Sequence, residues 1–273
     1  MNFKTLKITQ KPPNSPICHL NLNNPTLKNA LNSDFFIEFP KALTSLDQNP
    51  NVRIIILSGN GDHFCSGIDI KTLSSITGTT SLDRGRAGEL LRRQIKGLQS
   101  AITAIEQCRK PVVVAIHGAC IGGGIDLVSA CDMRYCSEDA FFSVKEVDLG
   151  LTADLGTLQR LPRIVGYGNA VELALTGRRV SGGEAKEIGL VSRVFKSKKE
   201  LNDGVRAIAE GMAAKSPMAI IGTKEVLLRS RDMSVDQGLD YVATWNSSML
   251  LSDDLTESIM AQMQKRKPVF AKL

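Results

Sequence analysis

The sequence HGACIGGGID at residues 117–126 decides the fold of this chain. It follows the run 111–116, which is short, apolar and rich in β-branched residues, and such a run predicts a strand buried on both faces. Glycines between a strand and a helix let backbone N–H groups approach a ligand, and the helix N-terminus adds partial positive charge. The stretch therefore predicts a turn that binds an anionic group, although tight turns without a ligand have the same pattern.

A second segment of this kind, HFCSGIDI at residues 63–70, follows the apolar run 52–57. We expect strands at 52–57 and 111–116 to pair in parallel, because strands of parallel sheets are buried on both faces. Between them, apolar residues at steps of three to five predict a helix over residues 88–107. Neither glycine segment has the spacing of a P-loop or of a dinucleotide fingerprint, so nucleotide binding is not indicated.

The rest of the chain divides into an α/β part, residues 1–196, and a helical part, residues 197–273. In the first part the sequence predicts short strands at 3–8 and 17–22, a helix at 33–46 and a mobile Ser/Thr/Gly-rich surface loop at 72–85. In the second part, Ser216-Pro217 matches a helix start, and Ser234 with Gln237 matches a capping box. The apolar stripes of these helices must bury either against the chain's own core or against partner subunits.

The composition excludes several classes of protein. Hydrophobic residues make up 42% of the 273 residues and charged residues 23%, which is ordinary for a folded globular protein. The net charge of +6 is spread without a basic run and aromatic residues are only 5%, so we do not expect nucleic acid as a partner, whereas an anionic metabolite fits. The six cysteines form no C-x-x-C pair, so no metal site is expected and the thiols are expected to be reduced and buried. No apolar stretch approaches the ~20 residues of a membrane span.

The sequence ends in Ala271-Lys272-Leu273, which is similar to the S-K-L peroxisomal address. Such a tripeptide is read by an import receptor, for which the tail must be free. We therefore expect a peroxisomal location, although three terminal residues can also match by chance.

Together, the two glycine segments resemble the crotonase (enoyl-CoA hydratase/isomerase) superfamily, whose members carry F-x-x-G-x-D and H-G-x-x-x-G-G-G at this separation. The resemblance covers essentially the whole chain. It implies an α/β fold, a crotonase-type spiral of ββα repeats with a helical C-terminal subdomain, and an oxyanion hole formed by the N–H groups of Ile68 and Gly123. It also implies an acyl-CoA thioester substrate, no separate cofactor because CoA is part of that substrate, and a homotrimer or homohexamer. The substrate-binding residues would be those that flank the two N–H groups, namely Ser66, Gly67, Asp69, Ile70, Gly122 and Gly124.

A third segment, KEVDLGLTADLG at residues 145–156, distinguishes between members of the superfamily. In the crotonase pattern Glu146 matches the glutamate near the carbon next to the thioester, and Asp126 matches the second catalytic glutamate of hydratases. Asp154 falls where hydratases carry glycine. A third carboxylate is costly in an apolar pocket, because buried charge is penalised and neighbouring carboxylates repel. The stretch from Asp126 to residues 157–162 resembles the dienoyl-CoA isomerases in particular.

The chemistry of that reaction gives an independent reason for two separated carboxylates. Converting a 3,5-dienoyl thioester into the 2,4-dienoyl form removes a proton at C2 and adds one at C6, and one side chain cannot easily reach both carbons. We assign Glu146 to C2 and Asp154 to C6, with Asp126 tuning their proton affinity or orienting them, and the two ends could be exchanged. Burial and like charge should raise the pKa of one member. Asp148 is interpreted as a solvated carboxylate, and Asp69 as a brace of the oxyanion turn.

Four alternatives remain open at this point. In an enoyl-CoA hydratase, Asp126 and Glu146 would activate water and Asp154 would be incidental, and hydration of a 2-enoyl-CoA would reveal this. A Δ3-Δ2-enoyl-CoA isomerase would rely mainly on Glu146. An RNA-binding protein would lose affinity steeply with salt. A CoA-binding scaffold without catalysis is harder to separate by sequence, but three pocket acids and two oxyanion turns argue against it.

Overall fold

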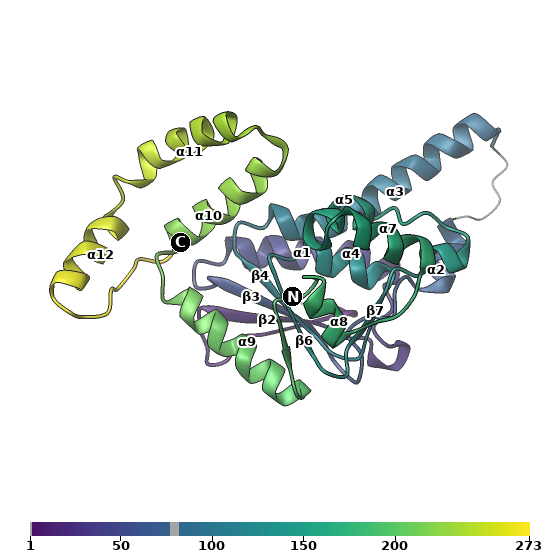
Figure 1. Ribbon diagram of the computed structural model, residues 1–273, viewed down its shortest axis with the longest axis horizontal. Coiled ribbons are helices and arrows are strands. Elements are labelled where there is room, and N and C mark those ends of the chain that lie inside the picture. Colours follow the sequence, from purple (N-terminus) through teal and green to yellow (C-terminus); the bar gives the residue numbers. More distant parts are fainter. Residues whose placement is uncertain (1, 77–81) are drawn as a thin grey trace.

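The computed structural model describes residues 2–76 and 82–273, and within them the core is a six-stranded sheet (Figure 1). Its strands, in spatial order, are β1 (Leu6–Thr9), β2 (Ile17–Leu22), β3 (Ile54–Gly59), β4 (Val112–Ile116), β6 (Met133–Ser137) and β9 (Arg193–Phe195). All neighbours pair in parallel except β1 with β2. The predicted parallel pairing of β3 with β4 is confirmed, and every residue of both strands is buried.

A smaller sheet contains β5 (Ala119–Ile121), β7 (Phe141–Ser143) and β8 (Val180–Ser181). The chain passes from β4 in the large sheet directly into β5 in the small one, and then into helix α4 (Gly123–Ala130). It repeats this path from β6 to β7, and β5 pairs in parallel with β7. This repeated crossing is the predicted crotonase-type ββα spiral. It places the turn between β5 and α4 at the end of β5, an edge strand of the small sheet.

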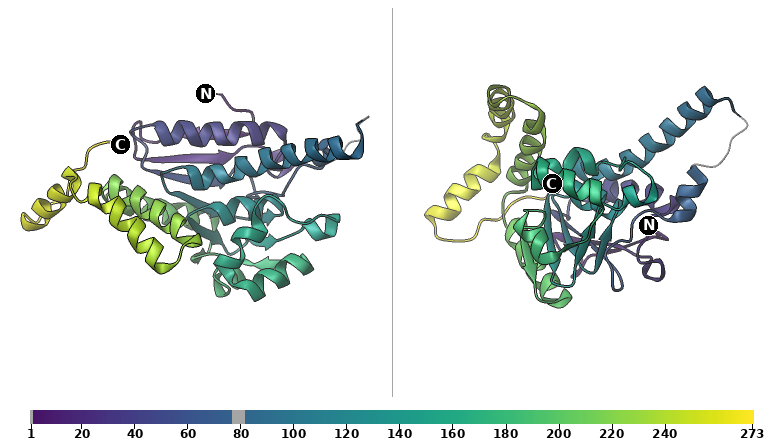
Figure 2. Two further views of the ribbon diagram at one scale, coloured as in Figure 1. Left: turned by 90° about the horizontal axis from the view of Figure 1, so that it is seen from above. Right: turned by 45° about the vertical axis from the view of Figure 1, so that its right-hand side comes forward.

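Helices cover both faces of the large sheet (Figures 1 and 2). On one face, α9 (Lys198–Ala213) buries Leu201, Val205 and Ala209 against strand residues such as Ile54. On the other face lie α4 and two longer helices, α1 (Ser33–Gln48) and α3 (Arg84–Gln107). The predicted helices at 33–46 and 88–107 are therefore confirmed, with somewhat wider bounds.

Three helices extend away from the body (Figures 1 and 2): α10 (Pro217–Arg229), α11 (Val235–Met249) and α12 (Asp253–Met263). The predicted caps are present, since Ser216 Oγ accepts a hydrogen bond from Ala219 N and Ser234 forms a capping box with Gln237. Several large apolar side chains of this arm are exposed in the single chain, namely Leu227, Val235, Leu239, Leu250, Leu251 and Met263.

The prediction of a loop over residues 72–85 was wrong at both of its ends. Helix α2 (Ile70–Ile76) begins before the expected loop and extends into it, and α3 already begins at Arg84. Short polar side chains start both helices: Asp69 Oδ1 accepts from Thr72 N at 3.0 Å, and Asp83 Oδ1 accepts from Gly85 N at 2.9 Å. Such caps stabilise helices that show no apolar periodicity. The middle of the predicted loop, 77–81, lies outside the described residues.

The remaining short elements lie in the connections between these strands and helices: η1 (Pro25–Leu27), η2 (Glu146–Leu149), α5 (Thr157–Arg160), α6 (Pro162–Val165), α7 (Tyr167–Thr176), α8 (Gly182–Glu187) and η3 (Ser230–Asp232). All six cysteines are free and buried, as predicted. In the part of the chain that the structure describes, no helix has the length and apolar character needed to cross a bilayer.

Candidate active site

The two glycine segments that the sequence singled out lie side by side. Phe64 N donates to His117 O at 2.8 Å, and Cys65 N donates to Ala119 O at 2.9 Å. Ile121 N donates back to Cys65 O at 3.0 Å, so the two segments pair like short parallel strands. The turn at Gly67 is thereby fixed against the turn at the start of α4.

These turns place the N–H groups of Ile68 and Gly123 next to each other. A Cβ built on Gly123 would lie 3.6 Å from Ile68 N. Gly67 has a φ of +98°, and a Cβ there would lie 3.1 Å from Ile121 O, so both its backbone conformation and the space require glycine. Within residues 2–76 and 82–273, neither N–H donates a hydrogen bond to the protein. Two free donors at the start of a helix form a site for a partly negative oxygen.

Glu146 lies beside these donors, at the start of η2. A Cβ on Gly122 would lie 3.5 Å from Glu146 Oε1, so the carboxyl group borders the oxyanion turn. Its other oxygen, Oε2, is buried and has no hydrogen-bond partner among the described residues. Burial, followed by the charges of Asp126 and Asp154, raises the pKa of Glu146 to about 7. The carboxyl group therefore titrates close to neutral pH.

Asp126 is a fully buried carboxyl group on α4. Its Oδ1 accepts two hydrogen bonds, each of 2.7 Å, from the backbone N and the hydroxyl of Thr157. Burial raises the pKa of Asp126 to about 6, although the bonds from Thr157 favour the ionised form. This balance keeps the proton affinity of Asp126 below that of Glu146.

Asp154 lies in the loop before α5, on the wall of a cavity of about 1150 Å³ between α3, α5 and α10. The residue is exposed as a whole, but partial burial still raises the pKa of its carboxyl group. Its charge in turn helps to raise the pKa of Asp126 and of Glu146. The three predicted acids therefore form one electrostatically coupled cluster, and Asp154 also lines the cavity.

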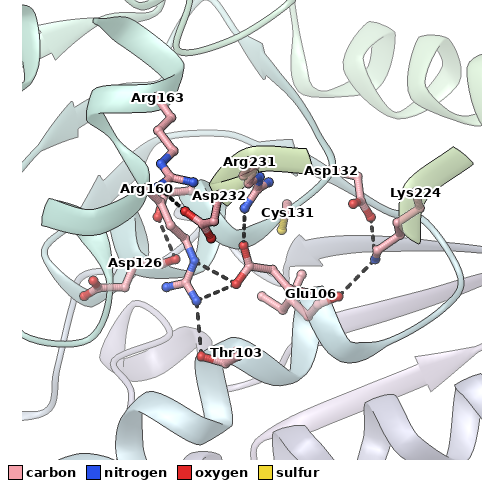
Figure 3. A network of polar contacts seen from close by, with 12 residues as sticks. Thr103, Glu106, Asp126, Cys131, Asp132, Arg160, Arg163, Lys224, Arg231 and Asp232 are labelled. Atoms are coloured by element: carbon pink, nitrogen blue, oxygen red, sulfur yellow. Dashed lines mark hydrogen bonds and ion pairs between the residues drawn. The ribbon is translucent and has the colours of Figure 1, made fainter. Parts of the chain in front are cut away.

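The loop that carries Asp154 is held by residues for which the sequence pattern predicted no role. Gln99 Nε2 on α3 donates to Asp154 O at 2.7 Å, and Arg160 Nη1 donates to Leu155 O at 3.4 Å. Figure 3 shows Glu106 between the guanidinium groups of Arg160 and Arg231, which it contacts at 2.6 Å each. These contacts join residues far apart in the chain, so no local pattern could have revealed them.

Other predicted site residues contact the scaffold. Ser66 Oγ donates to Leu27 O at 3.3 Å, and Asp69 caps α2, which agrees with its predicted bracing role. Ile70 is 70% exposed at the start of α2. A Cβ on Gly124 would lie 3.2 Å from the Cβ of Cys65, so this glycine allows α4 to pack closely.

Two further predictions concern surface groups. Asp148 pairs with Lys145 and is exposed, as expected of a solvated carboxylate. At the C-terminal tail, Ala271 O accepts from Arg53 Nη2 at 3.3 Å, and Leu273 lies in a small hollow beside Ile54. In this arrangement the tripeptide is in contact with the body, whereas receptor binding requires it to be free. Among the described residues, no group of His, Cys, Asp and Glu side chains could hold a metal ion.

Residues 13–272 match the family described as enoyl-CoA hydratase/isomerase, and the chain belongs to this family. It is 69% identical to the peroxisomal Δ(3,5)-Δ(2,4)-dienoyl-CoA isomerase of Arabidopsis thaliana, over 100% of this chain and 99% of the relative. It is 45% identical to the mitochondrial enzyme of that name from Rattus norvegicus, over 97% of this chain and 81% of the relative. Among solved structures, an enoyl-CoA hydratase from Bacillus anthracis has a TM-score of 0.89 at 30% identity, and the match covers 98% of this chain and 99% of that one.

Proposed function

We propose that this protein converts 3,5-dienoyl-CoA thioesters into the 2,4-dienoyl form. The proposal rests on the third carboxylate: Glu146 borders the turn with the two free N–H donors, Asp154 lies on the wall of the cavity, and the charge of Asp154 acts on both Glu146 and Asp126. A single base beside an oxyanion hole would suffice to shift one double bond to the neighbouring position. The additional acid gives the site a group for the distal end of a conjugated system. The isomerases from Arabidopsis and rat, at 69% and 45% identity, support the same reaction.

In the proposed mechanism, Ile68 N and Gly123 N donate hydrogen bonds to the thioester oxygen. Glu146 removes a proton from C2, and the electron pair of that C–H bond forms the C2–C3 double bond of the product. The electron pair of the C3–C4 double bond moves to C4–C5, and the electron pair of the C5–C6 double bond forms a C–H bond at C6 with a proton from Asp154. The charge of the intermediate dienolate rests on the thioester oxygen, where each donor is worth about 3 kcal/mol. No electron is gained or lost, so the reaction needs no cofactor besides the CoA of the substrate.

The pKa of Glu146 suits this role. A group that titrates at about 7 is ionised in part of the molecules at neutral pH and holds a proton readily once it has removed one from C2. The cluster must return to its starting state after each turnover, with Glu146 ionised and Asp154 protonated. Because the three carboxyl groups are coupled, exchange of one proton within the cluster or with water would restore that state.

We also propose a peroxisomal location, as in the name of the Arabidopsis relative, and a homotrimer or homohexamer. The exposed apolar side chains of α10–α12, among them Leu239 and Leu251, support burial of this arm between subunits. Reading of the tripeptide by an import receptor would require release of the tail from Arg53.

The test is to offer the purified protein a 3,5-dienoyl-CoA and to follow the absorbance of the conjugated 2,4-dienoyl product. We expect Asp154→Asn to lower turnover at least ~100-fold, the range for one general acid–base group. Asp148→Asn is the matched control, since it makes the same change on an exposed side chain that pairs with Lys145, and it should keep the parent's rate. Equal turnover of Asp154→Asn and the parent would refute the role of Asp154. Hydration of 2-enoyl-CoA without dienoyl isomerisation would replace the proposal with a hydratase.

A further inference from the structure

The coupled cluster contains one carboxyl group that the proposed proton path does not use. Asp126 is the most buried of the three acids, and burial alone would make it the group that takes up a proton first. If Asp126 held the proton shared by the cluster, Glu146 and Asp154 would both be ionised. No acid would then remain to protonate C6. The site therefore needs a group that keeps Asp126 ionised.

We propose that Thr157 is this group. It is a positioning residue whose hydroxyl and N–H keep Asp126 ionised, so that the proton shared by the three carboxyl groups stays on Glu146 or Asp154. The inference rests on the proposed function, whose reaction requires that proton. Both donors of Thr157 lie 2.7 Å from the same oxygen, Asp126 Oδ1. Hydrogen bonds to a charged acceptor are about twice as strong as neutral ones, so they favour the carboxylate.

The position of Thr157 is fixed by the same loop that carries Asp154. Gln99 holds the carbonyl of Asp154, and Gly156 turns the chain with a φ of +130°. Thr157 follows as the first residue of α5 and is completely buried. The backbone therefore holds both donors of Thr157 in place at Asp126. Their hydrogen bonds join α4 to the loop that carries Asp154.

The other groups around Asp126 do not replace Thr157. The guanidinium of Arg160 also lowers the pKa of Asp126, but less than the two hydrogen bonds from Thr157 do, and the same guanidinium binds Glu106. Burial keeps the nearby thiols of Cys65 and Cys120 neutral, because it raises their pKa. The titratable and charged groups that act on Asp126 are thus Glu146, Asp154, Arg160, Cys65 and Cys120.

The decisive variant is Thr157→Val, which removes the hydroxyl but keeps the branched shape and the N–H. Loss of one charge-assisted hydrogen bond should raise the proton affinity of Asp126 about 10- to 100-fold. The proton affinity of Asp126 would then equal or exceed that of Glu146. We therefore expect kcat on the plateau of its pH profile to fall about two- to tenfold, and the alkaline limb of that profile to move up by about 0.3 to 1 pH unit. KM should stay within about twofold, because Thr157 is not assigned to substrate binding.

The signature of this mechanism is a loss that depends on pH. Above the alkaline limb, where little of the cluster is protonated, the variant and the parent should have equal rates. Thr157→Ser keeps both donors and should restore the parent profile. Thr223→Val is the matched control, because this hydroxyl on α10 donates only to Ala219 O of its own helix. A uniform loss at every pH, with both limbs unmoved, would overturn the inference in favour of a purely structural role.

A second measurement does not depend on turnover. In protein labelled with ¹³C at the aspartate carboxyl carbons, the signal that disappears in Asp126→Asn reports the titration of Asp126. We expect its midpoint to rise by about one to two pH units in Thr157→Val, or in Thr157→Ala should the valine fail to fold, and to return in Thr157→Ser. An unmoved midpoint would refute the inference. If the parent did not isomerise 3,5-dienoyl-CoA, the proposed function would fail, while this titration would still decide whether Thr157 sets the ionisation of Asp126.

Discussion

Gly156 is the position at which the acid-bearing loop is most sensitive to a single methyl group. Its φ of +130° is strained for any L side chain, and a Cβ would lie 1.7 Å from Nη1 of Arg160. That guanidinium has little room to move, because it contacts Glu106 at 2.6 Å and Thr103 at 3.1 Å with a side chain only 13% exposed. Gly156→Ala must therefore distort the backbone and also displace a held cation.

The expected cost follows from these two terms. A non-glycine residue in such a backbone conformation costs about 2 kcal/mol. Moving Arg160 weakens its hydrogen bonds to the Glu106 carboxylate, which costs about 2 kcal/mol more, while Arg231 continues to neutralise Glu106. We expect Gly156→Ala to lower the free energy of unfolding by about 4 kcal/mol. It should also lower isomerase turnover, because Asp154 is only two residues away.

The assay is urea unfolding followed by circular dichroism, at equal protomer concentrations because assembly adds to apparent stability. Gly97→Ala is the matched control: this glycine lies on the exposed side of α3, and a Cβ there would meet nothing within 4 Å. It should stabilise the helix by about 0.5–1 kcal/mol. The reasoning is refuted if Gly156→Ala stays within about 0.5 kcal/mol of the parent, since neither strain nor displacement of Arg160 would then be present.

Two further predictions concern the oxyanion side of the site. Burial raises the pKa of Glu146 from 4.5 to about 7, so the folded chain binds more protons than the unfolded chain in this window and stability falls as pH rises through it. The free energy of unfolding of Glu146→Gln should therefore resemble that of the parent at pH ~4 and exceed it at pH ~8 by on the order of 2 kcal/mol. Equal urea midpoints at pH ~8 would contradict this. Gly67→Ala should turn Ile68 N–H away and lower kcat about 100-fold with the fold retained by circular dichroism, and undiminished kcat would argue against the oxyanion hole.

The sequence predicted those parts of the molecule that are encoded locally. The apolar run at β4 followed by Gly122 and Gly123 specifies a buried strand and a helix start within a dozen residues, so both could be inferred before any coordinates. The caps at Ser216 and Ser234 are equally local. Helix α2 was missed because it spans one short segment without apolar periodicity, and a single side chain, Asp69, starts it.

The residues that support the three proposed acids could not be predicted, because their contacts join distant parts of the chain. Thr157 and Asp126 are 31 residues apart, and Arg160 and Glu106 are 54 apart. The residue types alone also carry no predictive signal, since a threonine after a glycine is common in loops. Only the spiral, which returns the chain from β7 past α4, gives these residues their partners.

The N–H donors and the loop that carries Asp154 are separate parts of the structure, which explains how one fold can serve different acyl-CoA reactions. The two N–H donors depend on paired turns that all variants of the site can share, because polarising a thioester is common to each reaction. The distal acid depends instead on a separate loop, in which Gln99 fixes the carbonyl of Asp154, Gly156 provides the turn and Thr157 holds Asp126. An aspartate at position 154 without these three supports would add a charge near Glu146 but would not control which carboxyl group holds the proton. Under the proposed mechanism, the isomerase chemistry resides in this loop as a unit, and its specificity for a conjugated substrate follows from where the loop places the second acid.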